Sequence, residues 1–247
     1  SSHVFSKRFG GTSDQSITGV AVDGGGNVVI TGSFAGSVDF GGGTLTSAGG
    51  LDAFVARFDA LGNHLWSRTF GDASAQAGNG VAVDGSGDVF LTGYFEGTVS
   101  FGGGALASAG TQDVFVVRLD ADGNHVWSKR FGNASDQRGA GIAVVASGGL
   151  VTIGTLYGSI DFGGGTLTSA GLGDVYLARL DASGNHVWSK RFGDAGAQSG
   201  AAVAVDGSGY AMATGSFSGS VSFGGGVLTS SGSTDVFLAR YDSGGSH

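Results

Sequence analysis

The chain of 247 residues contains no cysteine and no proline, and it has one methionine and one glutamate, Glu96. The absence of cysteine excludes disulfide bonds and thiol chemistry. Only 13% of the residues are charged, about half the usual share for a soluble domain. No apolar run approaches the roughly 18 residues that a membrane span needs. The net charge of −8 argues against nucleic-acid binding, which requires basic side chains to neutralise phosphates.

Glycine is abundant, at 52 of 247 residues, and 40% of the chain is hydrophobic. The glycines separate short runs such as VVITGSF, DVFVVRLD and HVWSKRF, which are rich in valine, phenylalanine and tryptophan. Strand-forming residues bounded by turn-forming residues predict an all-β protein. The lack of proline fits paired strands, because proline cannot donate a hydrogen bond to a strand ladder.

One pattern recurs every 61 residues without insertion or deletion. It contains an aspartate, an arginine and a tryptophan at Asp52, Asp113, Asp174 and Asp235; Arg57, Arg118, Arg179 and Arg240; and Trp66, Trp127 and Trp188. We therefore predict one domain, residues 1–247, with repeats at approximately 10–70, 71–131, 132–192 and 193–247 plus 1–9. Such similar copies fit either a recently amplified natural repeat or an engineered sequence.

Each repeat contains four predicted strands. In the second repeat, residues 80–84 and 89–95 flank a glycine-rich turn and predict a hairpin, and residues 113–120 and 125–132 predict another. The segment 96–112 between them is expected to form a smaller hairpin, with inward-facing residues Val99, Phe101 and Leu106. Four antiparallel strands per repeat are typical of a propeller blade, so the predicted fold is a four-bladed β-propeller.

The two ends of the sequence complement each other. Residues 3–10, HVFSKRFG, have the sequence of a fourth strand, whereas the chain ends shortly after a third strand, FLARYD. We predict that the N-terminal strand completes the last blade and closes the ring, which leaves no unpaired edge. A monomer is favoured. The alternative is a homodimer in which two chains exchange their end strands and form one eight-bladed ring.

The motifs GVAVDGSGDVFLTGYF and DVFVVRLDADGNHVWSKRFG resemble the bacterial SBBP-type β-propeller repeat. The resemblance extends over all four repeats, but the FGGG between the hairpins is unusual for this family, which is associated with seven blades. The resemblance implies a propeller at the surface of a bacterium or outside it, and it implies no particular reaction.

The histidines share one repeat position, at the start of the last strand: His3, His64, His125, His186 and His247. We interpret them as solvated turn residues. A metal site shared by His3 and His247 after ring closure is the alternative. Turns such as DADGN, residues 120–124, resemble calcium loops but lack the downstream glutamate, and the same residue types favour tight hairpin turns. The glycine triplets are interpreted as flexible or close-packed turns.

The repeated aspartates and arginines predict hydrogen bonds or ion pairs between blades, with surface recognition as the alternative. The tryptophans predict packing between blades more than stacking against a ligand. The best candidates for binding are four glutamines in the loops that enter the innermost strands: Gln15, Gln76, Gln137 and Gln198. On a fourfold axis they would form a ring around an ion or water in the central channel, and no other cofactor is expected. Otherwise they hold their loops by hydrogen bonds.

The sequence favours a non-catalytic scaffold or binding module with a protein or glycan ligand. The alternative is a multivalent lectin with equivalent sites on each blade or between blades, because linked weak sites gain avidity. An enzyme would need a unique cluster of polar groups. Only Glu96 and residues 145–149 break the repeat clearly, so we do not expect an enzyme.

Overall fold

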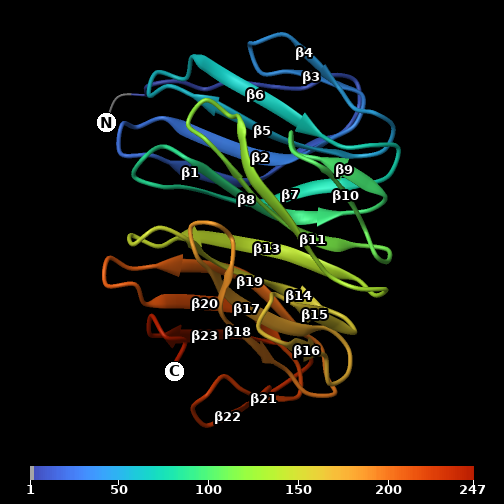
Figure 1. Cartoon of the computed structure of the whole chain (residues 1–247), viewed down its shortest axis with the longest axis vertical. Coiled ribbons are helices and arrows are strands. Elements are labelled where there is room, and N and C mark those ends of the chain that lie inside the picture. The colour runs from blue at the N-terminus through green and yellow to red at the C-terminus, as the bar shows by residue number, and fades with distance from the viewer. Residues whose placement is uncertain (1–2) are drawn as a thin grey trace.

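The computed structural model describes residues 3–247, so the first two residues of the predicted segment 1–9 lie outside it. The described residues form strands and turns without a helix (Figure 1). It follows that this part of the chain has no helix that is long and apolar enough to cross a membrane. The all-β prediction is confirmed.

The long strands of each repeat form one antiparallel sheet, which we call a blade. Blade 1 contains β1 (Gln15–Val22), β2 (Val28–Phe34), β5 (Asp52–Phe58) and β6 (His64–Phe70). Blade 2 contains β7 (Gln76–Val83), β8 (Val89–Phe95), β11 (Asp113–Leu119) and β12 (His125–Phe131). Blade 3 contains β13 (Gln137–Val144), β14 (Leu150–Leu156), β17 (Asp174–Leu180) and β18 (His186–Phe192). Blade 4 has three strands, β19 (Gln198–Val205), β20 (Ala211–Phe217) and β23 (Asp235–Tyr241).

A small hairpin is inserted between the second and third strands of every blade. The four pairs are β3 (Ser37–Asp39) with β4 (Thr44–Thr46), β9 (Thr98–Ser100) with β10 (Ala105–Ala107), β15 (Ser159–Asp161) with β16 (Thr166–Thr168), and β21 (Ser220–Ser222) with β22 (Val227–Thr229). In blade 2, Val99 and Phe101 are buried and Leu106 is half-buried. The predicted hairpin within residues 96–112 is therefore confirmed.

The innermost strand of each blade carries a β-bulge. In β7 the register with β8 shifts between Gly78 and Gly80. A side chain on Gly93, in the opposite strand, would place its Cβ 1.9 Å from the carbonyl oxygen of Ala77. The same approach recurs in the other blades at Gly32, Gly154 and Gly215. Only glycine leaves room for the bulged backbone at these positions.

The hydrophobic core lies between blades. We call the face of a blade that points to the preceding blade its upstream face, and the opposite one its downstream face. One cluster joins the downstream face of blade 1, including Val29 and Val55, to the upstream face of blade 2, including Leu91 and Phe115. Similar clusters join blades 2 and 3 and blades 3 and 4. The four blades are therefore stacked in sequence order, with their innermost strands in contact.

Ring closure within one chain is not what the structure shows. Blades 1 and 4 lie at opposite ends of the longest axis of the molecule (Figure 1). Residues 3–9 pack on blade 1, where Phe9 lies 5.2 Å from Phe40 between ring centroids. Within residues 3–247, β23 pairs with β20 and with no other strand. The predicted completion of the last blade by residues 1–9 of the same chain is thus corrected, because Phe9 fits blade 1 as the equivalent Phe70 fits blade 2.

Candidate functional site

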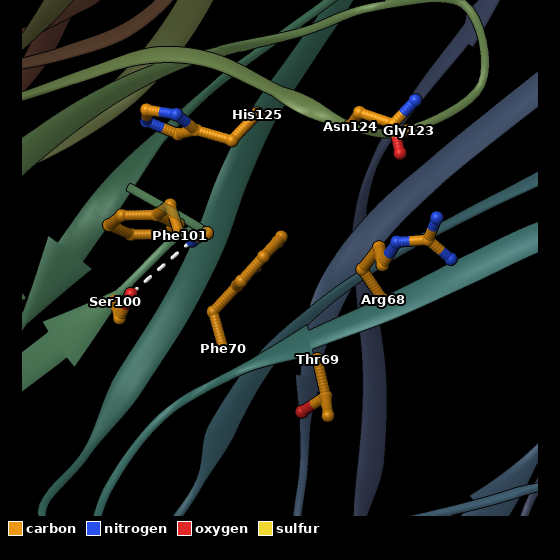
Figure 2. Close-up of a pocket in the computed structure, with 9 residues that line it drawn as sticks. Arg68, Thr69, Phe70, Ser100, Phe101, Gly123, Asn124 and His125 are labelled. Carbon is orange, nitrogen blue, oxygen red and sulfur yellow. Dashed lines mark hydrogen bonds between the residues drawn. The ribbon is translucent and has the colours of Figure 1, made fainter. Parts of the chain in front are cut away.

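A cleft opens between the outer parts of blades 1 and 2 and has a volume of about 590 Å³. One wall comes from β6, with Arg68 and Phe70, and the opposite wall comes from blade 2, with Ser100, Phe101 and His125. Figure 2 shows Phe70 and Phe101 in the middle of the cleft and Arg68 and His125 on different sides of it. The two phenylalanine rings lie 4.9 Å apart between centroids and form an apolar floor.

Alternation along β6 directs Trp66, Arg68 and Phe70 to the same face of the strand, toward blade 2. The Trp66 indole Nε1 donates a hydrogen bond of 2.9 Å to the carbonyl oxygen of Ala121 in blade 2. The Arg68 guanidinium lies 5.8 Å from the centroid of the Trp66 ring and donates to the carbonyl oxygen of Asp122 at 3.3 Å. These contacts hold a cation at the mouth of the cleft. The repeated tryptophans join neighbouring blades, as the packing interpretation predicts.

The first two glycines of each triplet lie against a histidine side chain, whereas the third has open space beside it. A Cβ on Gly103 would lie 2.4 Å from Cε1 of His125, so the imidazole rests directly on the glycine backbone. His125 Nε2 lies 3.0 Å from Ser128 Oγ. The interpretation of the triplets as close-packed turns is confirmed for their first two glycines. Three histidines, His64, His125 and His186, are half-buried, which corrects their interpretation as solvated turn residues.

The two terminal histidines do not form a pair in this structure. His3 lies beside Ser6, at 2.7 Å from Nε2 to Oγ, in the segment that packs on blade 1. His247 packs against Tyr241 in blade 4, with ring centroids 5.8 Å apart. Within residues 3–247 no group of three or more histidine, cysteine, aspartate or glutamate side chains is arranged to hold a metal ion.

The cleft contains a cation and no carboxylate among its lining residues. The equivalent position of Ser100 in blade 3 is Asp161, and Lys129 replaces Arg68. There the Lys129 Nζ donates to Asn185 Oδ1 at 3.2 Å and so reaches across to the next blade. Lys129 carries the same charge as Arg68, so the two clefts differ in charge at this pair of positions only because Ser100 replaces an aspartate. The first cleft therefore lacks the negative charge of Asp161, which suits an anionic or hydroxyl-rich ligand.

The repeated arginines connect consecutive blades. Arg57 Nη1 donates to the carbonyl oxygens of Gly87 at 2.8 Å and Ala121 at 2.9 Å, both in blade 2. Its Nη2 forms an ion pair of 2.5 Å with Asp23 in its own blade. Arg118 and Arg179 likewise donate to carbonyl oxygens of the next blade. The predicted hydrogen bonds between blades are confirmed for these three arginines.

The repeated aspartates have a different role, since their bonds stay within a blade. Asp113 Oδ2 accepts hydrogen bonds from Ala109 N at 2.8 Å and from Arg130 Nη1 at 2.6 Å. Asp52 accepts one from Ala48 N at 3.0 Å, but Thr69 occupies the position of Arg130. The prediction of contacts between blades is therefore corrected for the aspartates, which lie at the buried start of the third strand and face their own loop.

Asp52 provides a test of this arrangement. Burial raises the pKa of Asp52, the charge of Asp72 adds to this effect, and the hydrogen bond from Ala48 only partly opposes it. A folded-state pKa above the unfolded value means that the ionised carboxylate opposes folding at neutral pH, and that stability rises as the pH falls through the folded pKa. We expect Asp52→Asn to increase the free energy of unfolding at pH 7 and to remove this rise. Urea denaturation at pH 7 and in acid measures both.

Asp113→Asn is the matched control, because Asp113 has its arginine. It is expected to lower the free energy of unfolding by about 1.5–3 kcal/mol through loss of the charged hydrogen bond. Equal destabilisation by both substitutions would contradict the distinction between the two sites.

The glutamines hold their entry loops and do not face a central axis. The Gln137 amide accepts a hydrogen bond from Asn133 N at 2.9 Å and donates to Asn133 Oδ1 at 2.8 Å and to the carbonyl oxygen of Tyr157 at 2.7 Å. Gln76 and Gln198 make equivalent bonds, and all three are at most 1% exposed. Gln15, half-buried, binds Gly11 and Ala35 in the same manner. The structure supports the loop role over an ion ring.

The remaining sequence features are also structural. Asp120 Oδ1 accepts backbone hydrogen bonds from Asp122 at 3.0 Å and Asn124 at 2.8 Å, and hydrogen bonds from Asn124 lower its pKa. This confirms the tight-turn interpretation of residues 120–124. Glu96 accepts a hydrogen bond from Gln112 at 2.7 Å. Val145, at the start of the unusual turn 145–149, is buried against blade 4.

Residues 65–94, which contain most of β6, all of β7 and most of β8, match the family model described as SBBP: Beta-propeller repeat. These thirty residues thus have the pattern of an SBBP β-propeller repeat. It is also 28% identical over 168 residues to the Regulatory protein FlaEY of Caulobacter vibrioides (strain ATCC 19089 / CIP 103742 / CB 15), covering 65% of this chain and 18% of that protein. The chain thus spans less than a fifth of this relative.

The matched SBBP repeat contains two cleft residues, Arg68 and Phe70, that sequence reasoning did not select. A signal for Arg68 exists, because the other three repeats have lysine at its position. Ser100, just beyond the match, stands where two repeats have Asp39 and Asp161 and the last repeat has Ser222. The departure from the repeat at Arg68 therefore marks this cleft.

Proposed function

We propose that this chain is a non-catalytic binding module that receives an anionic, hydroxyl-rich ligand, such as an acidic oligosaccharide, between blades 1 and 2. The supporting observation is Arg68 at the mouth of a cleft that has no carboxylate in its lining. Arg68 would pair with the carboxylate of the ligand, and Ser100 and His125 would contact its hydroxyl groups. The resemblance to SBBP repeats supports a position at a bacterial surface.

Two observations favour binding over catalysis. The pair of His125 and Ser128 recurs in blades 1 and 3, but within residues 3–247 no carboxylate accepts a hydrogen bond from this imidazole to orient it. A serine nucleophile needs such an oriented base. In addition, the relative in Caulobacter vibrioides is named as a regulatory protein, which agrees with a non-catalytic role.

Isothermal titration with oligosaccharides that contain uronic acids tests the proposal, with their neutral counterparts as a comparison. We expect the acidic compounds to bind, with the cleft that contains Arg68 as the strongest site. Ser100→Asp, which copies the residue of blade 3, is expected to weaken binding by about 10-fold or more because the new carboxylate repels the ligand. Arg68→Lys, also copied from another blade, is the control that keeps the charge. Unchanged affinity of the Ser100→Asp variant would exclude this cleft.

A multivalent lectin remains the second candidate, since the geometry of the first cleft recurs between later blades. The phenylalanine pairs equivalent to Phe70 and Phe101 have centroid distances of 4.8 Å between blades 2 and 3 and 5.3 Å between blades 3 and 4. Several sites per chain for a neutral sugar, with no effect of Ser100→Asp, would favour the lectin over the acidic-ligand module.

A further inference from the structure

We propose that two copies of this chain join end to end through reciprocal exchange of residues 3–9, so that blade 4 of each copy packs on blade 1 of the other. The product is one ring of eight blades with two identical junctions. The proposal depends on the faces at the two ends of the row of blades and is independent of the ligand cleft.

The downstream face of blade 4 is apolar and open. Val236 and Leu238 are 82% and 76% exposed, whereas their equivalents in blade 2, Val114 and Val116, are both 0% exposed. The equivalents in blade 3, Val175 and Leu177, are 1% and 0% exposed. Side chains of the same type, at the same repeat position, are therefore covered wherever another blade follows. Two large aliphatic residues beside each other on an open face indicate a missing partner surface.

The upstream face of blade 1 is open where blade 4 would cover it. Val20 and Val22 on β1 are 65% and 61% exposed, whereas Val81, the equivalent of Val20 in blade 2, is 8% exposed. Val81 belongs to blade 2, and the downstream face of blade 1 covers it. The downstream face of blade 4 would cover Val20 in the same manner. It repeats the downstream face of blade 1, and the upstream face of blade 1 repeats the upstream face of blade 2, which already fit each other.

The N-terminal segment marks the place of that missing blade. Phe9 lies 5.2 Å from Phe40, as Phe70 lies 4.9 Å from Phe101 between ring centroids. A Cβ on Gly62 would lie 3.0 Å from the ring of Phe5, much as a Cβ on Gly123 would contact Trp66. Residues 3–9 thus pack on blade 1 as the outer strand of a preceding blade would, yet they form no ladder. The sheet that lacks such a strand is blade 4.

Two polar groups also find their partners in this arrangement. Arg130 pairs with Asp113, and Arg191 pairs with Asp174, each between the outer strand and the third strand of a blade. The equivalent pair in the last blade is Arg8 with Asp235, and neither residue forms an ion pair within the described chain. A second copy would bring Arg8 to Asp235.

The second group is the Arg240 side chain. Arg57, Arg118 and Arg179 all donate to a carbonyl oxygen in the turn of the next blade. The Arg240 side chain is 58% exposed; it forms an ion pair with Asp206 and lies 4.2 Å from the centroid of the Tyr210 ring, both in its own blade. Its missing acceptor is the carbonyl oxygen equivalent to that of Ala121, which belongs to Ala60 of the second copy.

The occupant is a second copy rather than the same chain, because blades 1 and 4 of one chain lie at opposite ends of the molecule (Figure 1). The junction would also form a cleft equivalent to the one between blades 1 and 2. Lys7, on the exchanged segment, would stand in its wall at the position of Arg68.

Light scattering coupled to size exclusion is expected to give twice the chain mass of 24.2 kDa. A mass of one chain, or a series of larger multiples, would overturn the proposal.

A cysteine pair locates the junction. Ser67, Ser128 and Ser189 stand opposite Ala56, Val117 and Ala178 in their ladders. By the same register Ser6 would stand opposite Ala239 of the second copy, at a Cα distance of about 5 Å that permits a disulfide. The Ser6→Cys, Ala239→Cys variant is expected to give a covalent dimer on a non-reducing gel. Ser6→Cys with Ser222→Cys is the control and should stay uncrosslinked. A disulfide within one chain, or none, would contradict the proposal.

Exchanging the charges of Arg8 and Asp235 tests the same junction independently and without a disulfide. Arg8→Asp and Asp235→Arg are each expected to weaken the dimer by about 10-fold, because each places like charges together. The variant with both substitutions restores the pair and should recover the dimer. If the variant with both substitutions lost as much dimer affinity as the two single variants together, Arg8 and Asp235 would not be in contact.

Discussion

Replacing Gly93 with alanine is expected to destabilise the protein by about 3 kcal/mol or more, because the new methyl group has no space. Its Cβ would lie 1.9 Å from the Ala77 carbonyl oxygen and 2.9 Å from the Phe115 ring. The carbonyl belongs to backbone beside the bulge, which is packed between blades 1 and 3, so neither neighbour can move away cheaply. Urea denaturation followed by circular dichroism measures the change.

Gly85→Ala is the control for this prediction. Gly85 lies in the turn between β7 and β8 of the same blade, and a Cβ there would meet nothing within 4 Å. We expect its free energy of unfolding to stay within about 0.5 kcal/mol of the original value. If Gly93→Ala were equally mild, the bulge would have to relax without cost, and the requirement for glycine would be wrong.

Replacing Arg57 with methionine is expected to lower the free energy of unfolding by about 3–5 kcal/mol. The side chains of Arg57 and Asp23 are only 7% and 8% exposed, so the substitution leaves a carboxylate that is nearly excluded from water. It also removes both hydrogen bonds to blade 2. Thermal and urea unfolding of the variant test this expectation.

A second variant separates the charge from the packing. Adding Asp23→Asn to Arg57→Met removes the unpaired carboxylate and should recover part of the loss. A double variant as unstable as Arg57→Met alone would assign the whole effect to the bonds between blades.

The pH dependence provides another measure of the same pair. Burial raises the pKa of Asp23, but hydrogen bonds from Asn27, Arg57 and Gly25 together lower it to about 2. A depressed folded-state pKa means that the stabilisation is present above the unfolded value, near 4, and is lost as the pH falls toward 2. We expect Arg57→Met to weaken this acid dependence. An unchanged acid profile would show that Arg57 contributes little to it.

Much of the fold is predictable from the sequence because its determinants are local. Runs of strand-forming residues alternate with Asp, Gly and Asn turns in every repeat, so both long hairpins and the small one are expected near their observed places. The role of residues 3–9 is different. The same repeat position both completes one blade and covers the next, so periodicity alone does not show which contact a terminal segment makes. Phe9 makes the second contact with Phe40 and Phe58.

The candidate site is harder to predict, for two physical reasons. From the sequence alone, a repeated polar residue such as Gln137 could equally line a central axis or hold a loop. Its hydrogen-bond partners decide between these roles, and they lie 4 and 20 residues away in the sequence. The cleft depends on Arg68 and Ser100, which come from adjacent blades. Arg68 stands out only by differing from the lysine of the other three repeats, and Ser100 shares its residue type with Ser222. Repetition therefore reveals the framework, whereas the departures from it indicate where binding is to be sought.

The matching faces have a consequence for how such a gene changes length. Each blade meets its neighbour through the same pair of surfaces, as Val114 and Val175 illustrate by their equal burial in successive blades. Recombination that inserts or removes 61 codons joins two surfaces that already fit, so the product needs no compensating mutation at the new boundary. Copy number can then change without a cost to the folding of any one blade.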